Sequence, residues 1–295
     1  MQFIKAHSAK WTVNRLCNAM QVTEAGYYKF LRIPDKSDKH EALLAQIYQI
    51  IRAEPENANY GVQRLYLALR NDYDYQGSQA TIYRVCRKNN LLIHRQPSTR
   101  WLTKADAEAQ KAENLLQQNF TADAPNQKWL TDITEIPCND GKVYLAPILD
   151  CYDGAIVAFS MAEHMRAELC TDVFKQACRK EHAQGMIIHS DRGSQFSSSL
   201  FRTELHKRGA KQSMSGVGRC YDNARMESFF ATLKKEKLYQ METRKMSKAE
   251  VRTEVYRYIQ YYNLRRIYST NGGWPPMKYR QQYYEQLAAA NRLAS

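Results

Sequence analysis

The succession of strand-like and helix-like segments after residue 122 constrains the fold more than any other feature of the sequence. The runs KWLTDITEIP and KVYLAPILDCY are strand-like and are separated by CNDG, a hairpin turn signal. GAIVAFSMA is a third strand-like run, after which helix-like and strand-like segments alternate as far as YDNARMESFFATLKKEKL. Three antiparallel strands followed by alternating helices and strands predict a mixed α/β layered domain.

The front of the chain has helical patterns. Residues 10–33 predict two short helices around a tight turn, with Thr23 capping the second, and Pro34 closes the unit. A second helical group spans about residues 41–95. Its last helix begins after the cap residue Ser78 and carries three basic side chains along one side. These are Arg84, Arg87 and Lys88. Such a basic last helix is typical of a helix-turn-helix module, and the alternative is a small helical domain with a solvated basic face.

The remaining segments flank the α/β region. Residues 96–122 predict a loop and a polar, alanine-rich helix with little to bury. At the other end, Ser247 and Glu250 have the spacing of a capping box. Tyrosines then alternate with arginines, a pattern that suits either DNA binding or tyrosine packing in a peripheral helix. The arginines include Arg265 and Arg266.

The pattern divides the chain into five parts. Residues 1–34 form a helix-turn-helix, 35–100 a second helical DNA-binding domain, 101–122 a helical linker, 123–240 the α/β core and 241–295 a basic and aromatic helical segment.

The charge distribution indicates a polyanionic partner. The chain carries a formal charge of +13, of which residues 1–122 contribute +6 and residues 228–295 contribute +8, while residues 123–227 have a net charge of −1. A near-neutral centre between basic arms favours nucleic acid, gripped by the arms, as the partner.

Two further features bear on location. The seven cysteines are scattered, without a CxxC pair, which favours reduced thiols over a disulfide framework or a zinc module. No run of 18 apolar residues occurs, and the N-terminus lacks the apolar stretch of a signal peptide. We therefore expect a cytoplasmic protein with no membrane partner.

Three acids lie at distinctive places in the predicted elements. Asp132 is expected inside the first strand, Asp191 ends the fourth strand in IIHSDRGSQF, and Glu227 lies in the long helix that follows. Buried acids are costly unless they are paired, and converging acids repel one another. A divalent cation removes that penalty, and carboxylate oxygens suit Mg²⁺ or Mn²⁺.

The stretches WLTDIT, IIHSDRGSQF and YDNARMESFFATLKKE together carry a resemblance to a known family. They resemble the integrase core of bacterial insertion-sequence transposases of the DDE type, above all the second-frame product of insertion-sequence family three. The resemblance covers essentially the whole chain, since the helical front half and the motif YYNLRR…PP also resemble that family.

The resemblance implies a ribonuclease-H-like catalytic core. It implies that Asp132, Asp191 and Glu227 bind two Mg²⁺ (or Mn²⁺) ions for DNA strand cleavage and strand transfer at the element ends. The implied partners are the terminal inverted repeats, target DNA, further copies of the chain in a dimer or larger multimer, and an upstream-frame protein joined by frameshifting. Two rival hypotheses remain open: a DNA-binding regulator without catalysis, and a structure-selective nuclease of the same fold.

Residues around the acids are candidate DNA contacts. Lys234 lies seven residues after Glu227, two helical turns along the same face, and Asn223 lies four residues before it. Arg192 and Gln195 follow Asp191. Several neighbours have other interpretations: His189 is a structural histidine, Asp150, Asp153 and Asp222 occupy turn or cap positions, and Gly193 permits a tight turn.

The sequence also departs from the family pattern in two places. Gly216 and Val217 stand where a basic pair is common, and Tyr268 and Asn271 stand where histidine and leucine are common. These departures affect the loop before the long helix and the C-terminal motif, and they leave the three acids untouched.

Overall fold

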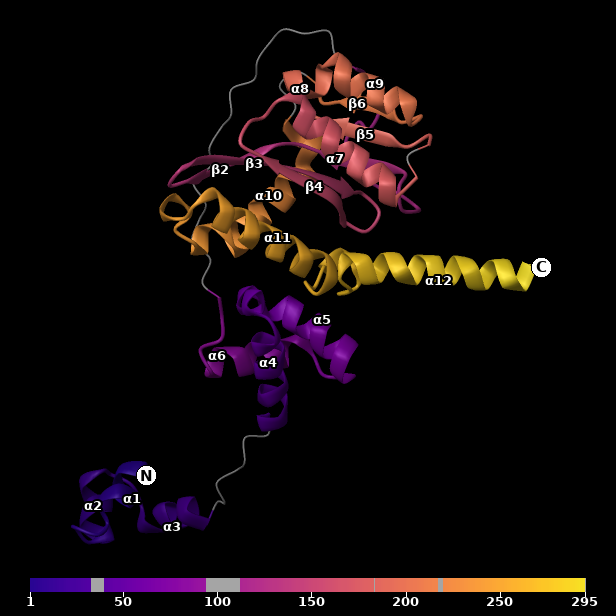
Figure 1. Cartoon of the computed structure of the whole chain (residues 1–295). Helices are drawn as coiled ribbons and strands as arrows, with labels where there is room; N and C mark the ends of the chain where they lie inside the picture. The colour runs from indigo at the N-terminus through magenta and orange to yellow at the C-terminus, as the bar shows by residue number, and fades with distance from the viewer. Residues whose placement is uncertain (33–39, 94–111, 183, 217–219, 295) are drawn as a thin grey trace. The chain divides into compact units, whose positions relative to one another are not determined.

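The structure, a computed structural model, describes residues 1–32, 40–93, 112–182, 184–216 and 220–294. Residues 128–214 contain a six-stranded mixed sheet (Figure 1). Strand β3 pairs antiparallel with β1, β2 and β4, and β1, β5 and β6 run parallel. The strands are β1 (Lys128–Thr131), β2 (Thr134–Cys138), β3 (Gly141–Asp150), β4 (Ile156–Ala162), β5 (Ile187–Ser190) and β6 (Lys211–Met214). The predicted mixed α/β core and its CNDG hairpin are confirmed.

The first predicted strand is interrupted at the acid it carries. β1 ends at Thr131 and β2 begins at Thr134, so Asp132 lies in a break in the strand and the expectation that it lies inside a continuous strand was wrong. The Oδ1 atom of Asp132 accepts a hydrogen bond of 2.7 Å from the backbone N–H of Ile133. A carboxylate that binds its neighbour's N–H competes with the ladder, which gives the break a local cause.

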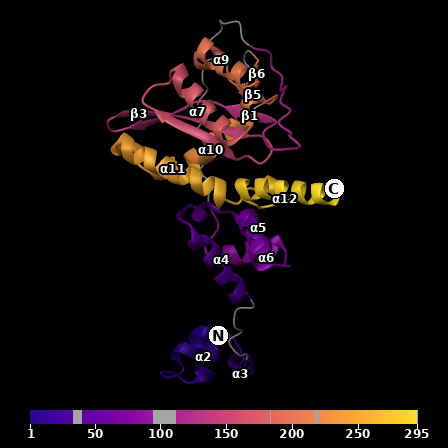
Figure 2. The same ribbon diagram turned by 45° about the vertical axis from the view of Figure 1, so that its right-hand side comes forward.

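Alternate residues of the strands pack on two helical layers (Figures 1 and 2). Trp129 of β1 faces α7, α8 and α9, whereas its neighbour Leu130 faces α10 and α11. This alternation is the period of two that a strand imposes on its side chains. The helices are α7 (Ala167–Lys180), α8 (Ser194–Ser197), α9 (Ser199–Lys207), α10 (Ala224–Glu236) and α11 (Lys248–Leu264). The capping box of Ser247 and Glu250 at the start of α11 is confirmed.

The chain separates into two compact units, residues 1–49 and 50–295. The first contains α1 (Gln2–His7), α2 (Val13–Ala19) and α3 (Glu24–Arg32), which pack around a small core that includes Ile4 and Tyr27. Thr23 Oγ1 accepts a hydrogen bond of 3.1 Å from the Gly26 N–H, as expected of a cap. The five-part division remains a prediction.

A second set of helices comprises α4 (Glu41–Ala53), η1 (Pro55–Asn59), α5 (Val62–Tyr73) and α6 (Gln79–Lys88). Ser78 caps α6, as predicted, because its side chain accepts a hydrogen bond from the Thr81 N–H. The predicted linker helix does not extend through residues 112–122, which form turns and bends, and the rest of that stretch lies outside the described residues.

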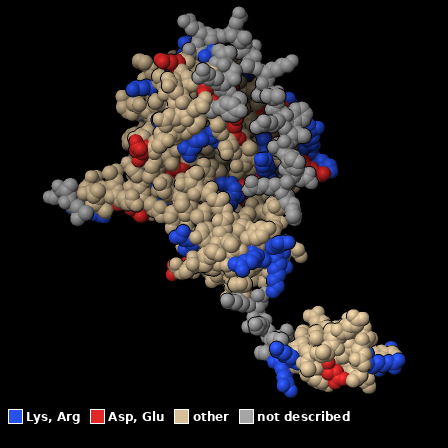
Figure 3. Space-filling model, turned by 180° about the vertical axis from the view of Figure 1, so that it is seen from behind, with Lys and Arg blue, Asp and Glu red and all other residues tan. Residues whose placement is uncertain are grey.

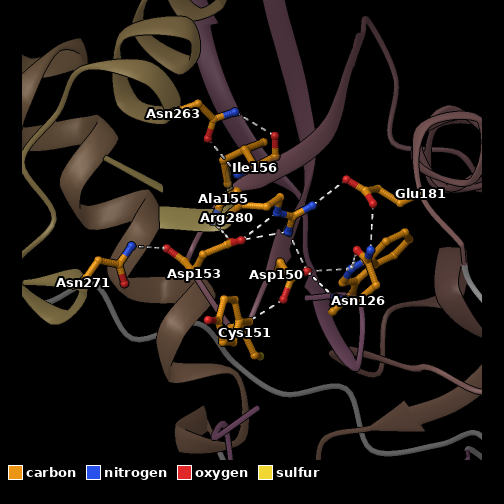
Figure 4. Close-up of polar contacts among 12 residues, drawn as sticks. Asn126, Asp150, Cys151, Asp153, Ala155, Ile156, Glu181, Asn263, Asn271 and Arg280 are labelled. Carbon is orange, nitrogen blue, oxygen red and sulfur yellow. Dashed lines mark hydrogen bonds and ion pairs between the residues drawn. The ribbon is translucent and has the colours of Figure 1, made fainter. Parts of the chain in front are cut away.

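Buried ion pairs join α12 (Pro276–Ala294) to the sheet (Figure 4). Arg280 donates hydrogen bonds of 2.6 Å to each of three carboxylates, those of Asp150, Asp153 and Glu181. Both aspartates are fully buried. Asp153 also accepts a hydrogen bond from the Ala155 N–H, so the predicted turn role is confirmed, but its charge is matched by a residue far along the chain. These contacts fix α12 at the end of β3, beyond which the helix continues outwards (Figure 1).

Two expectations about the chain's chemistry can be compared with the structure. Six cysteines within the described ranges are free thiols, as predicted. None of the described helices combines the length and apolar character that crossing a membrane requires.

Candidate functional site

Asp132 and Asp191 follow the ends of two neighbouring parallel strands. β1 and β5 pair with Leu130 opposite His189, so the residues that follow both strands emerge at the same edge of the sheet. Parallel strands bring their carboxyl ends together, which is where open α/β sheets hold their ligands. The register therefore brings these two acids to one place.

The charge of Asp191 acts on Asp132. Burial, and next the charge of Asp191, raise the pKa of Asp132 to about 7. The Ile133 N–H and the charge of Lys234 act in the opposite direction, and Glu227 adds a weaker repulsion. Asp132 is half-buried and Asp191 is exposed. Opposing like charges of this kind create a site that gains from a bound cation.

Glu227 lies in the first turn of α10 and is exposed, with its pKa raised by desolvation. No three His, Cys, Asp or Glu side chains among the described residues are grouped closely enough to hold a metal ion. The structure thus brings Asp132 and Asp191 together and places Glu227 within electrostatic range of Asp132, but outside a closed three-ligand cluster.

Asn223 lies between these groups. It is 5% exposed, and its Nδ2 atom donates a hydrogen bond of 3.4 Å to the carbonyl of Thr131, the residue before Asp132. Its buried Oδ1 atom has no hydrogen-bond partner among the described residues. Asn223 was predicted to contact DNA or the active-site loop, or else to cap the helix. The structure places it at the N-cap of α10, where it joins the start of that helix to the end of β1, and its contact with DNA remains a prediction. Carboxylate oxygens and an unpaired amide oxygen are the donors that Mg²⁺ and Mn²⁺ prefer.

Cys170 of α7 lies behind the acid pair and was missed by the sequence analysis. It is fully buried, and burial, followed by the charges of Asp191 and Asp132, raises the pKa of its thiol to about 12. Its spacing from Val173, Phe174 and Ala177 places it on the apolar side of the helix. This spacing is the sequence signal from which its burial could have been predicted. At neutral pH it is an uncharged thiol.

His189 is a structural histidine, as predicted. Both ring nitrogens face hydroxyl groups, with Nδ1 2.8 Å from Ser213 Oγ and Nε2 3.1 Å from Ser215 Oγ. Burial lowers its pKa to about 4, although the charge of Asp222 acts against this. The buried Asp222 accepts hydrogen bonds from the Gly216 N–H and from Asn114. It does not cap α10, because the N-cap of that helix is Asn223.

The residues after Asp191 lie over the same edge. Arg192 Nε donates a hydrogen bond of 2.6 Å to the Ser215 carbonyl, so this side chain joins two loops in the structure. The Gly193 N–H donates to Asp191 Oδ1 at 2.9 Å. Gly193 has an ordinary negative φ, so a tight turn does not require it. Its role is spatial, because a Cβ there would lie 3.0 Å from that carboxylate and against the Gln195 side chain.

The remaining candidate DNA contacts differ in exposure. Arg84, Arg87 and Lys88 are exposed on α6, and Figure 3 shows Lys and Arg side chains gathered over this helix. Lys234 is half-buried and acts electrostatically on Asp132. Arg265 is 64% exposed and pairs with Glu54.

Arg266 was predicted wrongly as a DNA contact. Its side chain is 5% exposed and forms a bidentate ion pair with Glu236, with N–O distances of 2.7 and 2.8 Å. A guanidinium whose donors face a buried carboxylate is not available to a phosphate. Its partner lies 30 residues away, so the sequence pattern alone did not reveal the pair.

Known proteins identify the family. Two stretches match the integrase core domain family, residues 122–220 and residues 208–276. InsK of Escherichia coli (strain K12), a putative transposase for insertion sequence element IS150, is 32% identical over 281 residues, 93% of this chain and 95% of that protein. InsF of the same strain, the transposase for insertion sequence IS3A, is 31% identical over 284 residues, 94% and 96% of the two chains. The chain belongs to insertion-sequence family three of the integrase-core transposases.

For a transposase of this family, the ribonuclease-H-like core expected from the sequence is confirmed. The family acts in DNA transposition and integration, so the edge of the sheet with Asp132 and Asp191 belongs to a DNA-processing core. Among solved structures, the HTLV-2 integrase catalytic core domain in complex with magnesium (trimeric form) is 18% identical, with a TM-score of 0.43, over 54% of this transposase and 99% of that chain.

Proposed function

We propose that this transposase cleaves DNA strands at the ends of its insertion element and joins the released 3′-hydroxyl ends to target DNA. The observation that carries the proposal is the convergence of Asp132 and Asp191 at one edge of the sheet, where burial, and next the charge of Asp191, raise the pKa of Asp132 to about 7. A half-buried acid beside a second acid is typical of sites that bind cations.

The proposed ligands of two Mg²⁺ or Mn²⁺ ions are Asp132, Asp191 and Glu227. When bound, a metal pair activates the attacking oxygen and stabilises the leaving oxygen in an in-line displacement. Glu227 is exposed at the first turn of α10 and outside the acid pair, so binding by all three carboxylates requires Glu227 to approach. Neutralising the repulsion between Asp132 and Asp191 favours that approach.

The rest of the chain has features that suit a DNA substrate. The exposed basic face of α6 suits backbone phosphates, and Lys234 lies close enough to the acids to act on the charge of Asp132. We propose that the chain works as a dimer or larger multimer on the element ends. Fusion to an upstream-frame protein, if it occurs, adds a further DNA-binding module.

The test is a strand-transfer assay with the element's terminal DNA and Mg²⁺. We expect Asp191→Asn and Glu227→Gln each to reduce cleavage and joining by about a thousandfold, because each substitution removes a charged metal ligand. Titration calorimetry with Mn²⁺ alone should show weaker binding to Asp191→Asn than to the wild type, independently of activity.

The matched control is Asp172→Asn, which alters an acid that is 61% exposed on α7. This variant should retain wild-type cleavage and Mn²⁺ binding. Full activity of Asp191→Asn would overturn the metal assignment. Cleavage without any joined product would favour the structure-selective nuclease, and DNA binding without cleavage would favour the regulator.

A further inference from the structure

A groove beside the acid pair is not used by the proposed chemistry. It has a volume of about 560 Å³ and lies between β2, the end of α10 and two short 3₁₀ helices, η3 (Leu238–Gln240) and η4 (Thr243–Lys245). Its lining is mainly apolar, contributed by Ile136, Pro137, Leu238 and Met241. A concave apolar surface with a few polar groups is the usual form of a binding site for an organic group.

The acids that line this groove form salt bridges, whereas two of its cations form none with the described residues. Glu135 pairs with Lys142 at 2.9 Å, and Glu242 pairs with Lys245 at 2.5 Å, so both acids of the lining already have partners. Lys234 and Arg244 also line the groove, and neither forms a salt bridge with a residue in the described part of the chain. The acids of the lining therefore pair with neither of these two cations, and the groove is complementary to an anion with an apolar body.

Tyr239 gives the groove an aromatic wall. Its side chain lines the groove and yet is 72% exposed, more than any other large hydrophobic residue on the described surface. Most tyrosines of the neighbouring α11, such as Tyr258 and Tyr262, are buried in the core instead. An exposed tyrosine beside unmatched cations is the arrangement on which unpaired nucleotides stack.

Lys234 connects the groove to the acids. The same lysine that lines the groove acts on the charge of Asp132. Lys234 is therefore the side chain shared by the groove and the surroundings of the acid pair.

We propose that this groove binds an unpaired nucleotide next to the reacting phosphate, with its base stacked on Tyr239 and its backbone phosphates at Lys234 and Arg244. This inference rests on the proposed function, because it takes the strand at the acids to be DNA. An apolar segment of a second protein would also fit the apolar floor of the groove. Such a segment carries no anion to pair with Lys234 and Arg244, so the nucleotide fits the lining better.

The test compares two forms of the element's terminal duplex, one blunt and one with a short unpaired overhang carrying 2-aminopurine. The full chain is used with Ca²⁺ and no Mg²⁺, so that binding is observed apart from strand cleavage. We expect wild-type protein to bind the overhang form more tightly and to quench the 2-aminopurine fluorescence. Tyr239→Ala should weaken overhang binding about five- to twentyfold and leave blunt binding unchanged.

Two variants check that stacking causes the effect. Tyr239→Phe and Tyr239→Trp keep an aromatic face, so they should retain the quenching and the preference for the overhang. Tyr256→Ala removes a tyrosine that is 54% exposed on α11, outside the groove lining, and should behave as the wild type.

The outcomes separate this inference from the proposed function. Equal loss of blunt and overhang binding in Tyr239→Ala, or no quenching by the wild type, would overturn the nucleotide site. Asp191→Asn should keep the quenching while it loses cleavage. If the wild type quenches but never cleaves in Mg²⁺, the nucleotide site stands and the proposed activity fails.

Discussion

At the scale of single residues, Glu236 shows how the fold determines the charge of a side chain. This carboxylate at the end of α10 accepts hydrogen bonds from Arg266, Arg64 and Tyr258. Burial acts to raise the pKa of Glu236, but the hydrogen bonds and charge of Arg266, with Arg64 beside it, hold it below its usual value. We call these four residues the Glu236 cluster.

Substitution of Glu236 by Gln should reduce the free energy of unfolding by about 3 kcal/mol at pH 7, because it leaves the buried Arg266 without a counter-charge. A lowered carboxyl pKa stabilises the folded state above the unfolded-state pKa, and this contribution is lost as the pH falls through the folded-state pKa. The difference between wild type and variant should therefore shrink below about pH 4.5. Urea unfolding at several pH values measures it.

The control for that experiment is Glu285→Gln, which alters an exposed acid on α12. Its effect should stay within about 0.5 kcal/mol. If Glu236→Gln changed the free energy of unfolding at pH 7 as little as Glu285→Gln does, the Glu236 cluster would contribute little to stability.

At the scale of elements, the junction between β1 and α10 carries the site. Asn223 holds the two together through its bond to the Thr131 carbonyl, and its Oδ1 atom is buried without a partner in the described chain. An unpaired buried oxygen costs free energy, which a bound cation or its water would recover.

Asn223→Ala should therefore change the unfolding free energy of the metal-free protein by less than about 1 kcal/mol, since it removes one long hydrogen bond together with one unpaired oxygen. It should also reduce the rise in melting temperature that Mg²⁺ produces. Differential scanning calorimetry with and without Mg²⁺ tests both points. A rise equal to that of the wild type would show that Asn223 does not support metal binding.

Most elements could be predicted from the sequence because their signals are local. The apolar runs that contain β3, β4 and β5, the caps at Ser78 and Ser247, and the helical pattern that became α10 all depend on neighbouring residues. The break at Asp132 could not be predicted, because the residues on both sides of it keep the alternation of a strand. The start of α10 beside the acids was expected from spacing, because the 35 residues between Asp191 and Glu227 suffice for a helix, a strand and the first turn of a second helix.

Contacts between distant segments escaped prediction for a different reason. Arg266 pairs with a residue 30 positions away, and Arg280 pairs with Asp150 across 130 positions. In the sequence, a buried arginine and an exposed one have the same pattern of neighbours. The interpretation of Arg266 as a DNA contact was wrong because the sequence does not show which carboxylate it meets.

At the scale of the whole molecule, Arg280 fixes the C-terminal helix to the sheet through three acids (Figure 4). Burial, and next the charge of Asp153, raise the pKa of Asp150 to about 6 even with Arg280 present. Three carboxylates surround the one guanidinium of Arg280, so the stability of this group depends on that arginine.

Arg280→Met should destabilise the protein by about 3–5 kcal/mol at neutral pH, because it leaves two buried carboxylates without a cation. The loss should be smaller near pH 5, where the raised pKa of Asp150 lets that group become neutral. Thermal unfolding at the two pH values measures this. Lys278→Met, which alters an exposed lysine over the Trp274 ring, is the control and should cost less than about 1 kcal/mol.

The Glu236 cluster also has a consequence for exchange between related elements. Arg64 comes from α5, and the adjoining Asn57 and Tyr60 bond to the hydroxyl of Tyr261 on α11. Consider a chimaera that takes the helices up to α6 from one relative and the α/β core from another. It keeps this contact only if the residues of the first parent at 57, 60 and 64 fit those of the second parent at 236 and 261. Under the proposed function, in which the basic face of α6 contacts DNA, changes on that face can alter recognition while the residues from 54 to 64 are inherited together with the core.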